Sequence, residues 1–177
     1  MRDVLKYIIG LLPFLLVACS DPAPQIPNNK IQQENPTESF MELNKEFAAI
    51  EDSIISSYMD SLSVPFTTTK SGIRYYITKE GDGDTVSATD DVTYRYSVRM
   101  LDGTSCEKLT DVVKTVNLEK SELERGYREA LRLLKVSGTG VFVMPSFMAY
   151  GVIGVPNCIP AWTPVECTIT LLEVTKK

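Results

Sequence analysis

The stretch FVMPSFMAYGVIGVPNCIP, residues 142–160, joins two strand-like segments through a long apolar loop. Loops of this length inside a compact domain are usually functional or disordered. This one is rich in aliphatic residues and proline and contains a tyrosine, which is not the composition of a disordered polar segment. Its main polar side-chain group is the hydroxyl of Tyr150. We therefore expect the loop to form a site that binds apolar, proline-like groups and does little proton chemistry.

The amino-acid composition excludes several kinds of catalytic and binding site. The chain of 177 residues contains no histidine, which excludes Ser-His-Asp and Cys-His catalysis and imidazole metal sites. An apolar fraction of 44% is enough for a globular core. The net charge of −5 does not favour binding to nucleic acid. We expect neither a cofactor nor a metal.

The N-terminus has the pattern of an export signal. Two cations, Arg2 and Lys6, precede an apolar run of signal-peptide length, so residues 1–18 are predicted to be a signal peptide. The run ends in LVAC, residues 16–19, which resembles the lipobox of bacterial lipoproteins and predicts lipidation of Cys19. An ordinary secretory signal followed by a chance cysteine is the alternative. The polar residues 19–34 hold three prolines and are predicted to be a flexible tether. The expected location is the bacterial cell envelope, on a membrane and facing the periplasm or the cell surface.

Residues 35–65 are predicted to be a helical extension. Pro36 suits the first helical position, although an S-x-x-E box at Ser39 leaves the start uncertain by one turn. The helix should end before Pro65. Apolar residues recur at steps of three and four: Phe40, Leu43, Phe47, Ile50, Ile54, Tyr58 and Leu62. This stripe is expected to be covered by the following domain or by a second copy of the chain in a homodimer.

Residues 66–177 are predicted to form one α+β domain. Strand patterns are found at 73–77, 92–100, 112–118, 141–144 and 165–174. Between the third and fourth, a helix is predicted to begin at Ser121 and to carry Leu123, Tyr127, Leu131 and Leu134 on one face. This order favours a twisted antiparallel sheet wrapped around one short helix.

From residue 71 to residue 174 the chain resembles the FKBP-type (immunophilin) peptidyl-prolyl cis-trans isomerases. The points of likeness are SGI-x-Y at 71–75, G-x-GDTV at 81–86, Tyr96 with LDG at 101–103, RGY at 125–127, and above all Pro145, AYG at 149–151, Gly154 and IP at 159–160. Together with the leader, the tether and segment 51–58, the chain looks like FKBP lipoproteins of Bacteroidetes-type bacteria. The resemblance implies an FKBP-like fold and isomerisation of X-Pro bonds in proline-containing segments of exported proteins, which assists their folding.

This reaction explains why histidine can be missing. Rotation about the X-Pro bond breaks no covalent bond, and its barrier of about 18–20 kcal/mol is the amide resonance that is lost when the bond twists. A dry aromatic or aliphatic pocket favours the twisted state over the planar, well-solvated amide. Such a pocket needs shape and hydrogen-bond donors rather than a general base.

The resemblance also implies a role for each residue at the site. Tyr150 matches the tyrosine whose hydroxyl donates to the substrate backbone. Tyr96 and Glu107 match the tyrosine and acid at the base of the pocket. The expected substrate-binding residues are Tyr127 as the aromatic floor, Leu123 as a wall, Glu124 through its backbone N–H, Val155 and Ile159 as the loop lining, and Cys106 and Cys167.

Several of these positions depart from the family pattern. Cys106, Lys114 and Cys167 stand where aromatic residues are expected, and Tyr127 stands where tryptophan is commoner. An aromatic side chain buries about 150–250 Å² and cysteine far less, so the apolar walls are smaller. The alternative function is therefore a catalytically weak FKBP-like module that binds or chaperones polypeptides in the cell envelope.

The cysteines leave their pairing open. A disulfide between Cys106 and Cys167 is one possibility, but a strand expected between them would place their Cα atoms beyond the limit of about 7 Å. Cys158, in the long loop, is a candidate for a free thiol.

Overall fold

The computed structural model describes the backbone of residues 36–177 and the side chains from residue 41. The predicted signal peptide, Cys19 and the tether lie outside the described residues. The first described element is the helix α2, Pro36–Ser61, which begins at Pro36 and ends before Pro65 as expected. Neither of the α-helices described is long and apolar enough to cross a lipid bilayer.

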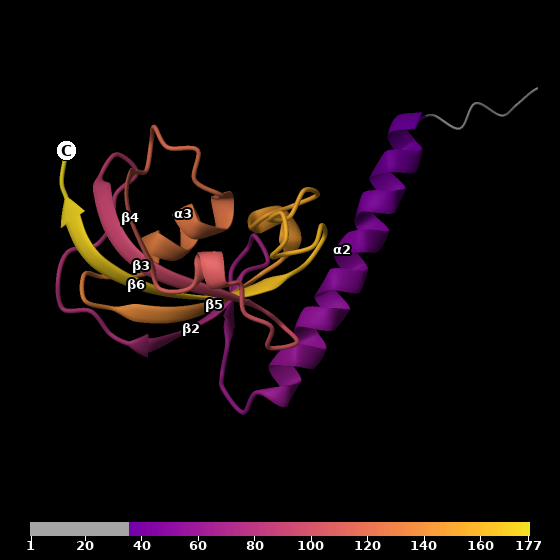
Figure 1. Ribbon diagram of the computed structural model, residues 1–177, viewed down its shortest axis with the longest axis horizontal. Helices are drawn as coiled ribbons and strands as arrows, with labels where there is room; N and C mark the ends of the chain where they lie inside the picture. Colours follow the sequence, from indigo (N-terminus) through magenta and orange to yellow (C-terminus); the bar gives the residue numbers. More distant parts are fainter. Residues whose placement is uncertain (1–35) are drawn as a thin grey trace, which may run out of the picture. The chain divides into compact units, whose positions relative to one another are not determined.

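The strands that follow α2 form a six-stranded sheet in the order β1-β2-β5-β6-β3-β4, and every neighbouring pair is antiparallel. The sheet is twisted and curves around the short helix α3, Arg125–Arg132 (Figure 1). The strands are β1 Thr67–Thr68, β2 Arg74–Lys79, β3 Asp91–Met100, β4 Val112–Asn117, β5 Thr139–Met144 and β6 Val165–Thr175. The described part of the chain also has two 3-10 turns: η2, Glu107–Leu109, lies between β3 and β4, and η3, Ser146–Met148, lies between β5 and β6. The predicted α+β architecture is confirmed.

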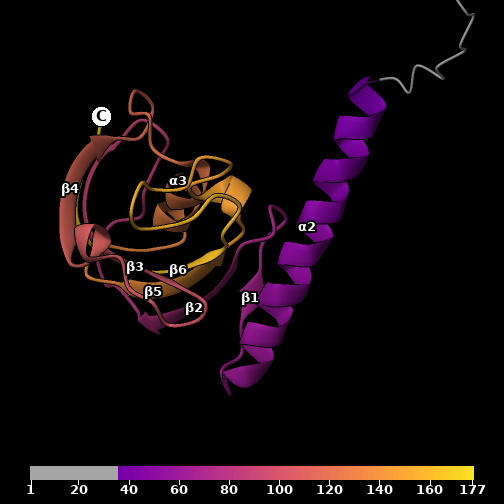
Figure 2. The same cartoon turned by 45° about the vertical axis from the view of Figure 1, so that its right-hand side comes forward.

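The core lies between α3 and the inner face of the sheet (Figure 2). In β3 the even-numbered residues from Val92 to Val98 are buried, which is the alternation of a strand with one covered face. From α3 come the buried Tyr127, Ala130 and Leu131. Gly126 lets the helix approach η3, because a Cβ at this position would lie 2.5 Å from the Met148 carbonyl oxygen. The close approach brings the first turn of α3 beside the long loop.

The helix α3 begins later than its sequence pattern predicts. The expected cap at Ser121 lies ahead of the helix, and Glu124 is the N-cap. The Arg128 guanidinium donates to the Ser121 carbonyl at 3.0 Å, which stabilises the non-helical approach to Glu124. The prediction at Ser121 was therefore wrong: residues 121–124 lead into the helix without being helical themselves.

The helix α2 packs on the domain through a face that matches the predicted stripe only in part: Phe47 and Tyr58 belong to both. Glu51 and Ile55 are buried, and the Phe47 ring stacks on Trp162 at 5.0 Å between centroids. Tyr58 donates to the buried Glu166 carboxylate at 2.5 Å. By contrast, the predicted stripe residues Leu43, Ile50 and Ile54 are 46–50% exposed.

The acid in this buried face has its own partner, which explains why an apolar pattern did not reveal it. Both carboxylate oxygens of Glu51 accept hydrogen bonds from Ser146: one from the backbone N–H at 2.9 Å and the other from the side-chain hydroxyl. Ser146 begins η3, so Glu51 satisfies a free donor at the start of this turn. The polar contact fixes α2 to the segment that leads into the long loop.

Candidate active site

A cavity of about 330 Å³ opens between β3, β4, α3 and the long loop. Five residues that the sequence predicts for the site line it, namely Tyr96, Glu124, Tyr127, Tyr150 and Val155. The cavity is also lined by Tyr94, Leu109, Lys114, Gly154 and Pro156. The structure thus brings together residues from four separate segments of the chain at one site.

The centre of the site is a cluster of tyrosine rings. The Tyr127 ring, on the first turn of α3, meets the Tyr96 ring edge-on at 5.4 Å and the Tyr150 ring at 6.3 Å between centroids. The hydroxyls of Tyr127 and Tyr150 are 2.6 Å apart and share a hydrogen bond. Tyr127 is 2% exposed, so it forms the floor, while the half-buried Tyr150 faces the opening.

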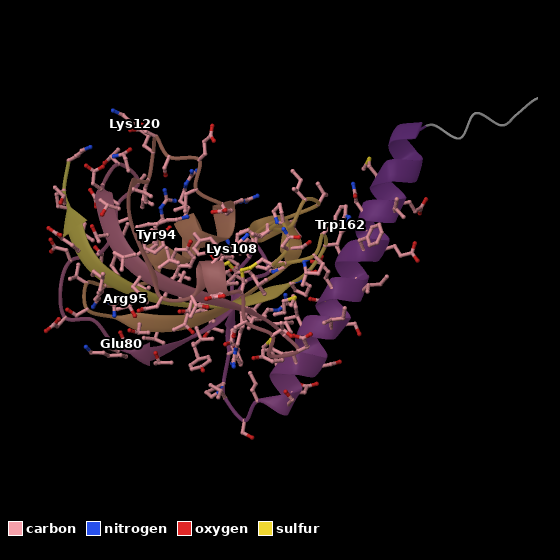
Figure 3. All side chains as sticks on the ribbon, in the orientation of Figure 1. Glu80, Tyr94, Arg95, Lys108, Lys120 and Trp162 are labelled. Atoms are coloured by element: carbon pink, nitrogen blue, oxygen red, sulfur yellow. A yellow bond between two sulfur atoms is a disulfide. The ribbon has the colours of Figure 1, made fainter. Side chains whose placement is uncertain are left out.

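Tyr94 belongs to the same cluster, although sequence reasoning missed it. Its ring lies 5.6 Å from that of Tyr96 and 6.5 Å from that of Tyr127, between the sheet and α3 (Figure 3). The side chain is fully buried, and within the described residues its hydroxyl has no hydrogen-bond partner. The signal that could have found it is the period of two in β3, which puts Tyr94 and Tyr96 on the same face.

One edge of the cavity is cationic. Lys114, on β4, is paired with Tyr94 in the sheet and holds its ammonium 5.3 Å from the centroid of the Tyr96 ring. This is a cation–π contact, which stabilises an exposed site by about 0.5–1 kcal/mol. The position expected to be aromatic from the family resemblance thus still covers an aromatic face.

The other predicted site residues do not line the cavity. Glu107 is exposed at the start of η2, whereas Leu123 is partly buried against the core. Ile159 is buried, and its carbonyl accepts the Val155 N–H at 2.8 Å, so it supports the shape of the loop from behind. Cys106 and Cys167 are buried in the core.

Cys158, the candidate for a free thiol, is part of a disulfide instead. Cys106 and Cys158 form a disulfide with Cα atoms 5.3 Å apart, and Cys167 is a free, fully buried thiol. The bond lies beside the turn that carries Lys108 (Figure 3). As expected, a strand separates Cys106 from Cys167. Val98 on β3 pairs with Cys167 and accepts the Cys106 N–H at 3.5 Å. The disulfide ties the long loop to the segment after β3.

Burial keeps the phenols of the site and the nearby Cys167 thiol neutral. It raises the pKa values of the Tyr94, Tyr127 and Tyr150 phenols well above the ordinary value of 10.0. It also raises the pKa of the Cys167 thiol from 9.0 to about 12. These groups all carry their protons at neutral pH. The site therefore offers neutral hydrogen-bond donors and aromatic surface to a ligand.

Comparisons with known proteins agree with this geometry. Residues 83–172, about half of the chain, match the family described as "FKBP-type peptidyl-prolyl cis-trans isomerase". A relative from Neisseria meningitidis, named "Probable FKBP-type peptidyl-prolyl cis-trans isomerase FkpA", is 37% identical over 83 residues, which are 47% of this chain and 30% of the relative. The FKBP-type isomerase FkpA of Aeromonas hydrophila is 30% identical over 109 residues, which are 62% of this chain and 40% of the relative.

Among solved structures, a peptidyl-prolyl cis-trans isomerase from Pseudomonas syringae superposes with a TM-score of 0.57 at 25% identity. That match covers 80% of this chain and 97% of the solved chain. The chain spans less than half the length of the two sequence relatives above. The family match nevertheless covers both sides of the cavity, from β3 to β6, and the chain belongs to the FKBP-type peptidyl-prolyl cis-trans isomerase family.

Proposed function

We propose that the protein is a peptidyl-prolyl cis-trans isomerase acting on X-Pro bonds of polypeptides. The observation that carries the proposal is the cavity itself, in which the Tyr96 and Tyr127 rings form aromatic walls and the Tyr150 hydroxyl lies at the opening. Both the family and the solved relative are named for this activity. The proline ring of a bound segment would lie against Tyr127.

The geometry suits a reaction that needs no proton transfer. In the twisted state of the X-Pro bond the carbonyl loses polarity, so contact with aromatic rings costs this state less than it costs the planar amide. The Tyr150 hydroxyl donates to a backbone carbonyl of the segment and holds it in place. The backbone N–H of Glu124, at the N-cap of α3, is the second proposed donor.

A protease-coupled assay on the peptide Ala-Leu-Pro-Phe with a C-terminal p-nitroanilide, which chymotrypsin releases only from the trans isomer, tests the proposal. The full chain is expected to accelerate the slow phase of cleavage, which reports the cis isomer. The Tyr150→Phe variant should lose about tenfold in kcat/KM, since an unmade hydrogen bond to a buried group costs about 1–3 kcal/mol. A wild-type rate equal to the uncatalysed rate would exclude the isomerase function.

A second candidate is an FKBP-like module that binds or chaperones polypeptides with little catalysis. The observation that favours it is the lining of the cavity. Four phenol rings line it, whereas Cys106 and Cys167, at positions where the family resemblance leads one to expect aromatic walls, do not. In this case the same tetrapeptide, with its scissile bond blocked, would bind in a calorimetric titration without any acceleration of isomerisation.

We further propose that the chain is anchored by lipid at Cys19 in the bacterial cell envelope, where exported proteins fold. The LVAC motif at residues 16–19 supports this, as does the Cys106–Cys158 disulfide, because structural disulfides persist in oxidising, exported compartments. Mass spectrometry of the mature chain should find acyl groups on Cys19. The Cys19→Ala variant should move from the membrane pellet to the soluble fraction.

We also propose that the chain forms a homodimer through the outer face of α2. Leu43, Ile50 and Ile54 are spaced by seven and four residues and are about half exposed, so they form one apolar stripe on the side away from Ile55. Sedimentation of the full chain is expected to give a dimer. The triple variant Leu43→Ser, Ile50→Ser, Ile54→Ser should sediment as a monomer with unchanged isomerase activity.

A further inference from the structure

The hydrogen bond between Tyr127 and Tyr150 joins the floor of the cavity to its opening. At 2.6 Å the two oxygens are at the short end of the range for O–H···O bonds. The Tyr127 ring is held by its edge-on contact with Tyr96, and its residue is nearly fully buried. Each phenol has one proton, so one of the two must donate and the other must accept.

The direction of this bond follows from what each oxygen can reach. Among the described residues, the Tyr127 hydroxyl makes its hydrogen bond with Tyr150, and the Cys167 thiol, which also raises the pKa of Tyr127, is a weak acceptor and a weak donor. If Tyr150 donated to Tyr127, the Tyr127 proton would have this thiol as its acceptor. If Tyr127 donates to Tyr150, it has a good acceptor, and the Tyr150 proton is free to point into the cavity. The second arrangement makes better use of both donors.

We propose that Tyr127 is a positioning residue whose hydroxyl donates to the Tyr150 oxygen and so directs the Tyr150 O–H toward a backbone carbonyl of the bound prolyl segment. The inference rests on the proposed isomerase function and extends it. A hydroxyl already fixed in one rotamer loses less freedom when substrate binds. A donor that itself accepts a hydrogen bond is also polarised and bonds more strongly.

Burial supports this arrangement. It raises the pKa values of both phenols, so both protons are present throughout the neutral range. The tyrosine on the helix thus has two functions that one substitution can separate. Its ring supplies the aromatic floor, and its hydroxyl orients Tyr150.

The test is a double-mutant cycle on the full chain with Tyr127→Phe, Tyr150→Phe and the double variant. Each substitution removes one hydroxyl and keeps the ring. For every protein, kcat and KM are measured with Ala-Leu-Pro-Phe, and the Kd of the same peptide with a blocked scissile bond is measured by calorimetry. Tyr75→Phe is the matched control, because Tyr75 stacks on Phe142 outside the cavity.

Loss of one net hydrogen bond predicts a rise of about threefold to tenfold in KM and Kd for Tyr127→Phe, with kcat changed less than twofold. In the Tyr150→Phe background the same substitution should have no further effect, because the group that it orients is gone. Tyr75→Phe should match the wild type. Melting curves of all variants verify that they are folded.

The inference is overturned if Tyr127→Phe has the KM and Kd of the wild type, or if the effects of the two substitutions on these constants are independent and multiply. It is also overturned if the Tyr127→Phe variant loses activity only because it unfolds. A wild-type chain that binds the peptide without isomerising it overturns the proposed function alone, and the cycle is then evaluated on Kd. A wild-type chain that does neither overturns both.

Discussion

Cys167 lies in a densely packed part of the core, where a larger side chain would need more room. Its side chain is fully buried on the inner face of β6, and its partner in the register on β3 is the buried Val98. The resemblance to the family leads one to expect phenylalanine at position 167. The Val98 side chain, directly opposite Cys167 in the sheet, occupies part of the space that a phenylalanine ring would need.

We therefore expect Cys167→Phe to destabilise the protein by about 1–3 kcal/mol, the usual cost of overpacking a dense core. Adding Val98→Ala in the same chain should restore part of this loss, because it makes room for the new ring. Urea unfolding monitored by circular dichroism measures both free energies. Strictly additive effects of the two substitutions would contradict the idea that they share one space.

At the scale of elements, the disulfide is the main covalent restraint on the long loop. It closes a segment with a sequence separation of 52 residues, and a restraint of this kind typically stabilises a folded protein by about 2–4 kcal/mol. Within the loop, Val155 accepts the Cys158 and Ile159 N–H groups at 3.0 and 2.9 Å. The cavity wall at Val155 therefore depends on both the bond and the turn.

The double variant Cys106→Ala, Cys158→Ala is expected to unfold at a lower urea concentration than the wild type. It should also have a higher KM, since Val155 is no longer held in place. Adding a dithiol reductant should shift the wild type to the same midpoint and leave the double variant unchanged. A reductant effect of equal size in both proteins would show that another group is responsible.

The contact between α2 and η3 is the second restraint on this region. Glu51→Gln keeps an acceptor oxygen but replaces the other with an NH₂ group, so one Ser146 donor loses its partner. We expect this buried loss to cost about 1–3 kcal/mol in unfolding free energy. The matched control is Asp52→Asn on the exposed side of the same helix, whose Arg74 ion pair should be worth less than about 1 kcal/mol. Thermal melts that do not distinguish the two variants would exclude a structural role for the Glu51 carboxylate.

At the scale of the whole molecule, the buried phenols and thiol make stability fall in alkali. In the folded state burial raises the pKa of Cys167 from 9.0 to about 12 and that of Tyr58 from 10.0 to about 12. The folded protein therefore keeps protons that the unfolded chain releases. Since stability falls with rising pH wherever the unfolded state binds fewer protons, this contribution is complete below about pH 9 and declines above it.

The melting temperature is accordingly expected to be level between about pH 7 and 8.5 and to fall from about pH 9 upward. Cys167→Ala should move the onset toward pH 10, where the tyrosines of the unfolded chain begin to titrate. Differential scanning calorimetry at constant ionic strength measures both curves. Stability that stays constant through pH 10.5 in the wild type would count against burial of these groups.

Much of this molecule can be predicted from its sequence, and the failures have physical causes. The alternation in β3 and the motifs around Tyr127 and Tyr150 predicted the sheet, the helix and three tyrosines of the cavity. Tyr94 was missed because a period of two gives the face of a residue and not its distance from a cavity. The pairing of Cys158 could not be read from the sequence, since spacing does not determine disulfide connectivity. The packing face of α2 was predicted only in part, because a pattern of apolar residues includes Phe47 and Tyr58 but passes over the buried, hydrogen-bonded Glu51.

The contact between Glu51 and Ser146 has a further consequence for where this protein can be divided. The segment that matches the family begins at residue 83, yet the acceptor for the turn ahead of Tyr150 is supplied from α2, and β2, a neighbour of β5, also precedes that segment. Residues 83–172 transplanted alone would leave an edge of the sheet and a buried serine without partners. The boundary of the family match is therefore not the boundary of the unit that folds in this chain.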